Sequence, residues 1–366
     1  MDQNSVQQDM SPEQAAKAAR KRASKAKWKK ICRVVDRIFG FFLATFIMIG
    51  IAGLGLEYVL VKGPSTGLKE KFVMTMMESR RFRFMSQIFL NADEVDEIFA
   101  RGNDTLDVEF DPSLIQIAPQ NAQPQDGQQA DPAETGNDPY GYVDEDGDGY
   151  ILVDVKGKGY TGHMLIVLDP TRVFVGAGGE GQTLDQIVAR TGAIGGINGG
   201  AFEDQDGTGT GRSPEGLTII DGQLIEAGQG LRESFVGFDA DGVMHVGYYN
   251  FRDALEAGIV SGVSFYPPLI VNGVPQEVIS GINPRTAIGQ RADGAVLMLV
   301  VDGRQLSSSG CTYMDLVDIM VDFGAVNAMN LDGGSSTVMI VNGEMINSPS
   351  SASGYSRGLP NAILFR

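Results

Sequence analysis

The longest apolar stretch of the chain lies near its N-terminus, at residues 39–56. These eighteen residues, FGFFLATFIMIGIAGLGL, contain no charged residue and no proline. As a helix they extend over roughly 27 Å, close to the thickness of a bilayer core. The pattern predicts a transmembrane helix over residues 38–61. The alternative is a cleaved signal peptide, but the stretch is long for one, and Gly-Leu-Glu-Tyr at its end is a poor cleavage site.

The next part of the chain alternates apolar and charged residues and then becomes polar. Residues 69–100 have helical periodicity, which predicts a helical juxtamembrane stalk over residues 62–110; a solvated spacer is the alternative. Residues 111–149 are rich in Pro, Gln, Asn and Asp and predict a flexible linker. The linker ends in Asp144, Asp146 and Asp148, which resemble a calcium loop. Val155 stands where that loop needs a bidentate glutamate, so we interpret the three acids as a turn.

From residue 150 to the C-terminus, short β-like stretches alternate with glycines, and two stretches have helical periodicity. The predicted helices are 183–190, which Thr183 caps, and 312–323, which Thr312 caps. The predicted fold class is α+β, with a mixed β-sheet core and flanking helices. Glycines in the stretch 176–181 resemble a dinucleotide-binding fingerprint. The strand and helix unit that such a site requires does not follow them, so we assign no nucleotide site.

Charge is distributed unevenly on the two sides of the apolar stretch. Residues 1–37 carry ten Lys or Arg against four acids, whereas the remainder carries 19 basic and 42 acidic residues. The positive-inside rule therefore predicts a single-pass protein of the cell membrane, with a basic cytoplasmic tail and the acidic C-terminal part outside the cell. A basic arm also suits nucleic acid. Because the basic arm lies next to a predicted membrane span, a membrane anchor is sufficient to explain its charge. We therefore expect no nucleic-acid partner.

The stretch NAMNLDGGSST at 327–337 carries the strongest candidate chemistry. Asp332 follows apolar residues and precedes two glycines, so a carboxylate is expected at a strand end, beside accessible amides and three hydroxyls. Such a surface suits a sugar or a phosphate. An ordinary hairpin turn built on Asp-Gly is the alternative.

Three further residues stand at comparable places. Asn198 precedes two glycines in IGGINGGAF, which suits sugar hydroxyls, although Asn-Gly is also a common turn. Arg285 follows a proline at the start of an apolar stretch, where a guanidinium is held for a phosphate, or for an ion pair with an acid of the chain. Asp302 ends the apolar stretch 295–301. We expect the unit 295–332 to bring Asp302 and Asp332 to one edge of the sheet.

Four stretches together resemble the phosphodiester glycosidase family: GINGGAF (196–202), PRTAIGQ (284–290), DGRQLSSSG (302–310) and NAMNLDGGSST (327–337). The resemblance covers residues 150–366 and implies a phosphodiester glycosidase domain there. By matching motifs it places Asn198, Arg285, Asp302 and Asp332 in the catalytic pocket. The residues that it implies for substrate binding are Gly199, Gly200, Thr286, Ser309, Gly310, Gly333, Gly334 and Ser335.

The activity that the resemblance implies is hydrolysis of the glycosidic C–O bond of sugar-1-phosphodiesters in a phosphate-linked, cell-surface or secreted glycan. Two alternatives stay open, a non-catalytic glycan-binding module and a phosphodiesterase that cleaves P–O. No cofactor is assigned, and the sequence leaves open whether a divalent cation takes part. The two histidines, His163 and His245, do not have metal-ligand spacing. Cys311 lacks a histidine nearby in the sequence that would activate it, so we do not expect it to be a nucleophile.

Overall fold

The structure is a computed structural model that describes residues 12–78, 80–117 except 103–107, 139–203 except 180, 211–228, 232–351 and 356–366. Most of the predicted linker, from residue 118 to residue 138, lies outside the described residues. The chain divides into two compact units, of which the first ends at Pro64 and the second runs from Ser65 to Arg366.

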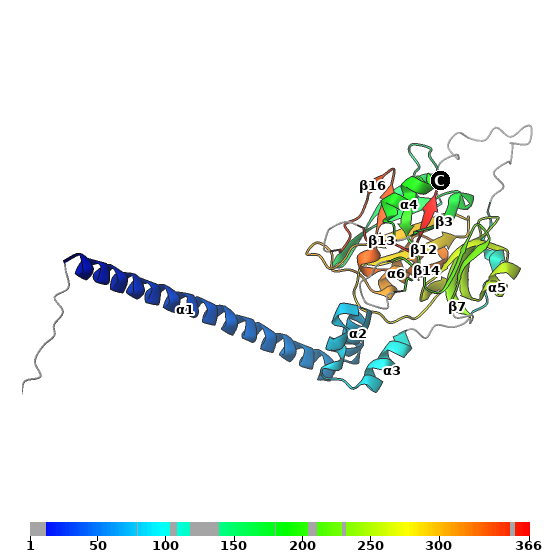
Figure 1. Ribbon diagram of the computed structural model, residues 1–366. Coiled ribbons are helices and arrows are strands. Elements are labelled where there is room, and N and C mark those ends of the chain that lie inside the picture. Colours follow the sequence, from blue (N-terminus) through cyan, green and yellow to red (C-terminus); the bar gives the residue numbers. More distant parts are fainter. Residues whose placement is uncertain are drawn as a thin grey trace, which may run out of the picture. The chain divides into compact units, whose positions relative to one another are not determined.

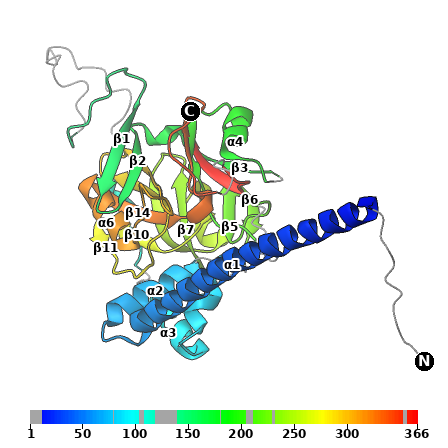
Figure 2. The ribbon, with the colours of Figure 1, turned by 90° about the vertical axis from the view of Figure 1, so that its left-hand side faces the viewer.

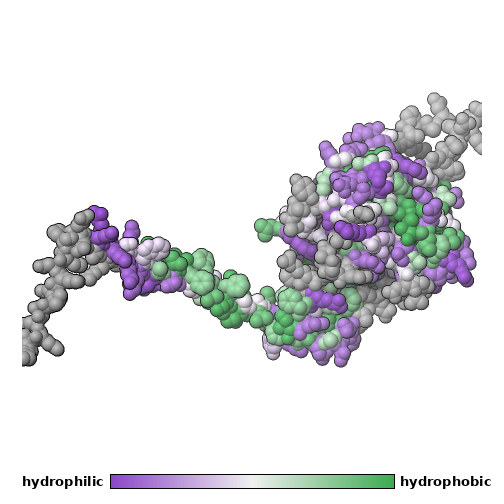
Figure 3. Space-filling model, in the orientation of Figure 1, coloured by the Kyte–Doolittle hydropathy of each residue, from purple (hydrophilic) through white to green (hydrophobic). Residues whose placement is uncertain are grey.

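The first unit contains one long helix, α1 (Pro12–Lys62). Within it, the stretch Lys27–Lys62 is long and apolar enough to cross a membrane, a test that a signal sequence also passes. Figure 3 shows hydrophilic residues toward the N-terminal end of the helix and hydrophobic ones further along it. Phe39, Phe41 and Phe46 expose about two thirds or more of their surface (67%, 69% and 75%). Water does not favour such a surface on a lone helix, whereas lipid does.

The second unit contains three β-sheets, drawn from teal to red in Figure 1, whose pairings between named strands are all antiparallel. The seven-stranded sheet has the order β1 (Tyr150–Gly157), β2 (Tyr160–Val167), β13 (Val296–Val301), β12 (Arg285–Arg291), β14 (Ala325–Leu331), β10 (Pro268–Val271), β11 (Val274–Pro275). The first five-stranded sheet has the order β16 (Glu344–Met345), β15 (Met339–Val341), β4 (Gly195–Asn198), β17 (Asn361–Phe365), β3 (Val173–Ala177). The second has the order β6 (Gln223–Ala227), β5 (Leu217–Ile220), β9 (Ile259–Ser264), β7 (Glu233–Asp239), β8 (Met244–Tyr249).

One hydrophobic core joins the three sheets, and a helix covers the outer face of each. Residues from all three sheets share the central cluster, among them Ile288, Ile363 and Val263. The outer clusters contain α6 (Tyr313–Asp322) on the large sheet and α4 (Leu184–Thr191) and α5 (Phe251–Glu256) on the two smaller ones. Figure 2 shows α6 beside β10 and β14, and α4 beside β3. Burial on both faces explains why β12 and β13 are buried along their whole length. The predicted α+β class is confirmed.

Strand register brings three predicted site residues to the same end of three neighbouring inner strands of the large sheet. We call this end of the strands the sheet edge. Arg285, the first residue of β12, pairs with Val301, the last of β13. Its neighbour Thr286 pairs with Leu331, the last residue of β14. The chain therefore leaves β13 at Asp302 and leaves β14 at Asp332 on the two sides of the start of β12.

The segment predicted as a stalk belongs to the same compact unit as the sheets. It consists of α2 (Thr66–Glu78), the 3₁₀ helix η1 (Arg80–Gln87) and α3 (Ala92–Gly102), which pack on one another. Val73, Met74 and Val95 are buried there. The described residues contain three more 3₁₀ turns, η2 (Pro112–Leu114), η3 (Pro170–Arg172) and η4 (Gly334–Ser336).

Asp239 at the end of β7 makes a pH-dependent contribution to stability. Burial raises its pKa, but hydrogen bonds from His245 and from the backbone N–H of Val243 and Asp241 outweigh burial, and its pKa lies below the usual value of an aspartate. A depressed folded-state pKa stabilises the fold above the unfolded value, and this stabilisation is lost as the pH falls through the folded value. We expect Asp239→Asn to lower the free energy of unfolding by roughly 1–3 kcal/mol near pH 7. Below about pH 4 the deficit should shrink. Chemical denaturation across pH 3–7 measures it, and a pH-independent deficit would contradict the assignment.

Candidate active site

A cavity of about 500 Å³ opens beside the edge where β12, β13 and β14 meet. Asp332 lines it, together with residues from α2, from the loop after β4 and from the sheet of β7 and β9. Its aromatic lining includes Phe265 and Tyr266, whose rings stack with centroids 5.2 Å apart. The residues of the lining are Glu78, Ala201, Phe202, Glu215, Gly216, Gly228, Glu233, Ser234, Ser264, Phe265, Tyr266 and Asp332.

The loop that carries Asp332 is attached to the neighbouring strands by its backbone. The N–H of Asp332 donates to the carbonyl of Gly199 at 3.2 Å, and the N–H of Gly334 donates to the carbonyl of Pro284 at 2.9 Å. Gly334 has φ +62°, a conformation that glycine adopts without strain. A Cβ added at Gly333 would lie 2.7 Å from the carbonyl oxygen of Pro284. The two glycines thus let the chain turn directly against β12 and hold the Asp332 carboxylate at the cavity.

Asn198, the last residue of β4, is fully buried and supports this loop. Its Nδ2 donates to the main-chain carbonyl of Asp332 at 2.5 Å. Its Oδ1 accepts from the hydroxyl of Thr286 at 2.8 Å and from the N–H of Val338 at 3.1 Å. These contacts engage both the amide nitrogen and the amide oxygen, so Asn198 fixes the main chain at Asp332.

We expect Asn198→Ala to lower kcat by roughly 100-fold with little change in KM, because a misplacement of about 1 Å can cost that much. Leaving the buried N–H of Val338 without its acceptor should also lower the free energy of unfolding by about 1–3 kcal/mol. Steady-state kinetics and chemical denaturation measure the two effects. Thr286→Ser, which retains the hydroxyl, is the control. An unchanged kcat in folded Asn198→Ala would show that Asp332 does not depend on Asn198.

Asp302 lies at the same sheet edge, but the structure does not place it among the residues that line the cavity. Its Oδ1 accepts from Nδ2 of Asn347 at 2.9 Å and from the N–H of Ser348 at 3.0 Å. Burial raises the pKa of Asp302, and these hydrogen bonds only partly offset that effect. The loop of residues 307–310 also packs here, since Ser308 donates to the carbonyl of Asp302 at 2.6 Å. In this position the Asp302 carboxylate holds the segment after β16.

Arg285 is buried, and its guanidinium is held on several sides. Nη2 donates to Glu78 Oε2 at 2.5 Å and to the carbonyl of Gly281 at 2.7 Å, and the guanidinium carbon lies 4.1 Å from the centroid of the Tyr313 ring. Burial lowers the pKa of Arg285, but the Glu78 carboxylate raises it, and the net pKa lies above the usual value. Arg285 therefore stays charged. It is not among the residues that line the cavity, but its partner Glu78 is.

The remaining predicted substrate-binding residues divide into two groups. Gly199 and Gly200 permit close packing near the cavity, because an added Cβ would lie 2.2 Å from Asn361 Oδ1 and 2.5 Å from the carbonyl oxygen of Ser264, respectively. Ser335, on the Asp332 loop, accepts a long 3.5 Å contact from Arg357. Ser309 instead donates to the carbonyl of Gly159 at 2.8 Å, in the turn between β1 and β2. Gly310 lies against the backbone of Asn283.

Sequence reasoning did not identify several residues that the structure brings to this region. Glu78 reaches it from α2, more than 200 positions before Arg285 and Asp332. Asn283 and Arg304 lie next to Arg285. Asn283 directly precedes the motif at 284–290 and Arg304 lies within the motif at 302–310, a signal that could have drawn attention to them. No local signal marks Glu78. Within the residues that the structure describes, no group of three or more His, Cys, Asp or Glu is arranged to hold a metal ion.

Asp332 at the end of β14 and Arg285 at the start of β12 both lie in a part of the chain that matches a known protein family. The sequence model of the phosphodiester glycosidase family matches residues 191–366. The match covers just under half of the chain, and over this part the chain is similar to the phosphodiester glycosidase family. The described fold is larger than the match, since β1, β2 and β3 complete two of the sheets from residues before 191.

Two curated relatives are similar to this part of the chain. Mouse N-acetylglucosamine-1-phosphodiester alpha-N-acetylglucosaminidase is 28% identical over 228 residues, which cover 53% of this chain and 42% of the mouse protein. The SPbeta prophage-derived uncharacterized protein YomE of Bacillus subtilis is 32% identical over 196 residues, 49% of this chain and 29% of YomE. The chain thus spans less than half the length of either relative.

The fold is also that of a solved structure, the zebrafish N-acetylglucosamine-1-phosphodiester alpha-N-acetylglucosaminidase catalytic domain auto-inhibited by its pro-peptide. The likeness covers 59% of this chain and 82% of that one, with a TM-score of 0.50 and 24% identity. At this identity the likeness supports the fold alone.

Proposed function

We propose that the chain is a hydrolase that cleaves the glycosidic C–O bond of sugar-1-phosphodiesters in a cell-surface or secreted glycan. The observation that carries the proposal is at the edge of the large sheet, where the carboxylate of Asp332 is among those that line a cavity of about 500 Å³ and the cation Arg285 begins the neighbouring strand. The similarity of residues 191–366 to the family supports the same reaction class.

The distribution of charge around the cavity supports an orientation for the substrate. Four carboxylates line the cavity, those of Glu78, Glu215, Glu233 and Asp332. A phosphate among them would be repelled, whereas sugar hydroxyls donate well to carboxylates, and sugar rings pack on aromatic faces such as that of Tyr266. We therefore place the sugar in the cavity and the phosphate toward Arg285, with the anomeric carbon near Asp332.

Cleavage of the C–O bond is chemically consistent with a site of this kind. Glycosidases usually need a carboxylic acid to protonate a poor leaving group. A departing phosphate monoester, whose second pKa is about 6, leaves without such an acid once a guanidinium neutralises its charge. One carboxylate, which we propose to be Asp332, then stabilises the oxocarbenium-like carbon or directs the attacking water.

Hydrolysis in ¹⁸O-labelled water tests the reaction. The full chain in detergent is incubated with methyl phosphodiesters of α- and β-linked hexoses and N-acetylhexosamines, and both products are analysed by mass spectrometry. Label in the sugar hydroxyl is the expected result. Label in the phosphate would replace the proposal by a phosphodiesterase, and binding without turnover of any diester would replace it by a glycan-binding module.

We also propose that α1 anchors the protein in the cell membrane, with the N-terminus in the cytoplasm and the C-terminal domain outside. The apolar stretch Lys27–Lys62 and the excess of basic residues before residue 38 support this topology. Phosphate-linked glycans of the cell surface would then lie within reach of the domain.

The two cysteines provide a test of the topology, because Cys32 is exposed on α1 and Cys311 is buried. Burial raises the pKa of the Cys311 thiol, so it should not react in the folded protein. We expect a membrane-impermeant maleimide to label Cys32 only after the cells are permeabilised. A Glu97→Cys variant, at an exposed position of α3, should be labelled in intact cells. Labelling of Cys32 in intact cells would contradict the proposed orientation.

A further inference from the structure

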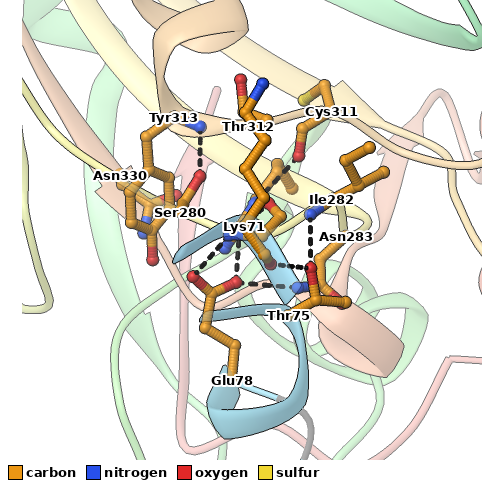
Figure 4. Close-up of polar contacts among 12 residues, drawn as sticks. Lys71, Thr75, Glu78, Ser280, Ile282, Asn283, Cys311, Thr312, Tyr313 and Asn330 are labelled. Atoms are coloured by element: carbon orange, nitrogen blue, oxygen red, sulfur yellow. Dashed lines mark hydrogen bonds and ion pairs between the residues drawn. The ribbon is translucent and has the colours of Figure 1, made fainter. Parts of the chain in front are cut away.

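The carboxylate of Glu78, the last residue of α2, is bound by three donors of the C-terminal domain (Figure 4). The N–H of Gly281 donates to Oε1 at 3.1 Å. Asn283 Nδ2 and Arg285 Nη2 donate to Oε2 at 2.7 and 2.5 Å. The Glu78 side chain is only 12% exposed. We call the group formed by Gly281 N–H, Asn283, Arg285 and the adjacent Arg304 the anion cradle.

Arg304 brings a second guanidinium to the cradle. Its Nη2 donates to Oδ1 of Asn283 at 2.9 Å, so it orients the amide that binds Glu78. Burial lowers the pKa of Arg304, the charge of Arg285 lowers it further, and Glu78 partly offsets both. The cradle therefore contains two guanidinium groups, Arg285 bonded to Glu78 and Arg304 bonded to Asn283, beside the one carboxylate of Glu78. Such an excess of positive charge suits a site that binds an anion more than it suits a neutral structural ion pair.

A second residue of α2 contacts the same segment of the C-terminal domain. The hydroxyl of Thr75 accepts from the N–H of Ile282 at 3.2 Å (Figure 4). Gly281 has no side chain here, and a Cβ at this position would lie 2.2 Å from Thr75 Cα. Glu78 also lines the cavity that contains Asp332. Glu78 is therefore shared by the cradle and the cavity.

We propose that the anion cradle is the phosphate subsite, that Asn283 and Arg304 bind the phosphate together with Arg285, and that Glu78 occupies the subsite until a phosphodiester displaces it. A carboxylate and a phosphodiester each carry one negative charge on two equivalent oxygens. The exchange therefore preserves the charge and the hydrogen-bonding pattern of the cradle. The identity of the ligand as a diester rests on the proposed function; the affinity of the cradle for an anion does not.

Isothermal titration of the full chain in detergent with dimethyl phosphate, and separately with inorganic phosphate, tests the proposal. We expect Glu78→Ala to bind both at least tenfold more tightly than the wild type, as follows if Glu78 fills the cradle in about 90% or more of the molecules. Gly281→Ala should act in the same direction, because its Cβ displaces α2 and leaves the four donors in place. Adding Arg304→Gln to Glu78→Ala should reverse most of the gain.

Glu97→Ala is the matched control, since it removes an exposed carboxylate from α3 and should leave the affinity unchanged. If folded Glu78→Ala and Gly281→Ala bind phosphate no more tightly than the wild type, Glu78 is a structural partner of Arg285 and the proposal is overturned. If both variants gain affinity but no diester is hydrolysed, the anion subsite stands and the proposed function fails. If diesters are hydrolysed and neither variant changes affinity or KM, this inference alone fails.

Discussion

Asp332→Asn is expected to lower kcat by about 100- to 1000-fold or more while the protein stays folded, because it removes a charge aimed at the reacting carbon. The substitution keeps the size of the side chain. The anchors of the loop are main-chain groups, namely the N–H of Asp332 on Gly199 and its carbonyl on Asn198, and both survive the change. Single-turnover kinetics with a sugar-1-phosphodiester, together with a denaturation curve, measure the effect.

Asp302→Asn is the matched control for this prediction. Both aspartates follow a strand at the same sheet edge, but the carboxylate of Asp302 binds Asn347 and Ser348. We expect this variant to retain kcat within about tenfold, because the group lies outside the cavity lining. If Asp302→Asn loses turnover and folded Asp332→Asn does not, the roles of the two acids are the reverse of those proposed.

Arg285→Lys is expected to reduce kcat/KM by about 100- to 1000-fold, the second large effect. Lysine retains the charge but presents a single ammonium group, whereas the guanidinium reaches Glu78 and Gly281 and lies over the Tyr313 ring. The planar fork is what a phosphate with two free oxygens requires. Steady-state kinetics on phosphodiesters of different leaving groups measure the loss, which should be largest for the poorest leaving group.

Arg291→Lys, at the other end of β12, controls for the loss of a buried guanidinium. Arg291 is 1% exposed, pairs with Asp293 at 2.7 Å and lies over the Tyr140 ring at 4.8 Å. We expect both variants to lower the free energy of unfolding and only Arg285→Lys to lose activity. Equal losses of activity would mean that Arg285 serves the fold and not the phosphate.

Much of the fold and part of the site are encoded locally. Short-range sequence patterns predict three features of the structure: the apolar helix before residue 62, the glycine-separated strands, and the two capped helices of the C-terminal domain. Thr183 and Thr312 begin helices in the structure as their sequences predict, because a capping residue and the apolar period behind it act within one or two turns. The strand ends that carry Asn198 and Asp332 were recognisable for a similar reason, since an apolar strand, a polar residue and two glycines are adjacent in the sequence.

The sequence by itself therefore determined which residues stand at strand ends, and only the tertiary structure decided which of them meet. Asp302 and Asp332 have similar local sequences, yet only Asp332 lines the cavity, because a segment 45 residues beyond Asp302 binds its carboxylate. Glu78 has no distinguishing local pattern, and its place beside Arg285 depends on the packing of α2 against residues 280–283. Contacts of this kind join segments more than 200 positions apart. These contacts are stabilised by strand register and by side-chain packing between elements. A short-range sequence pattern does not predict either of them.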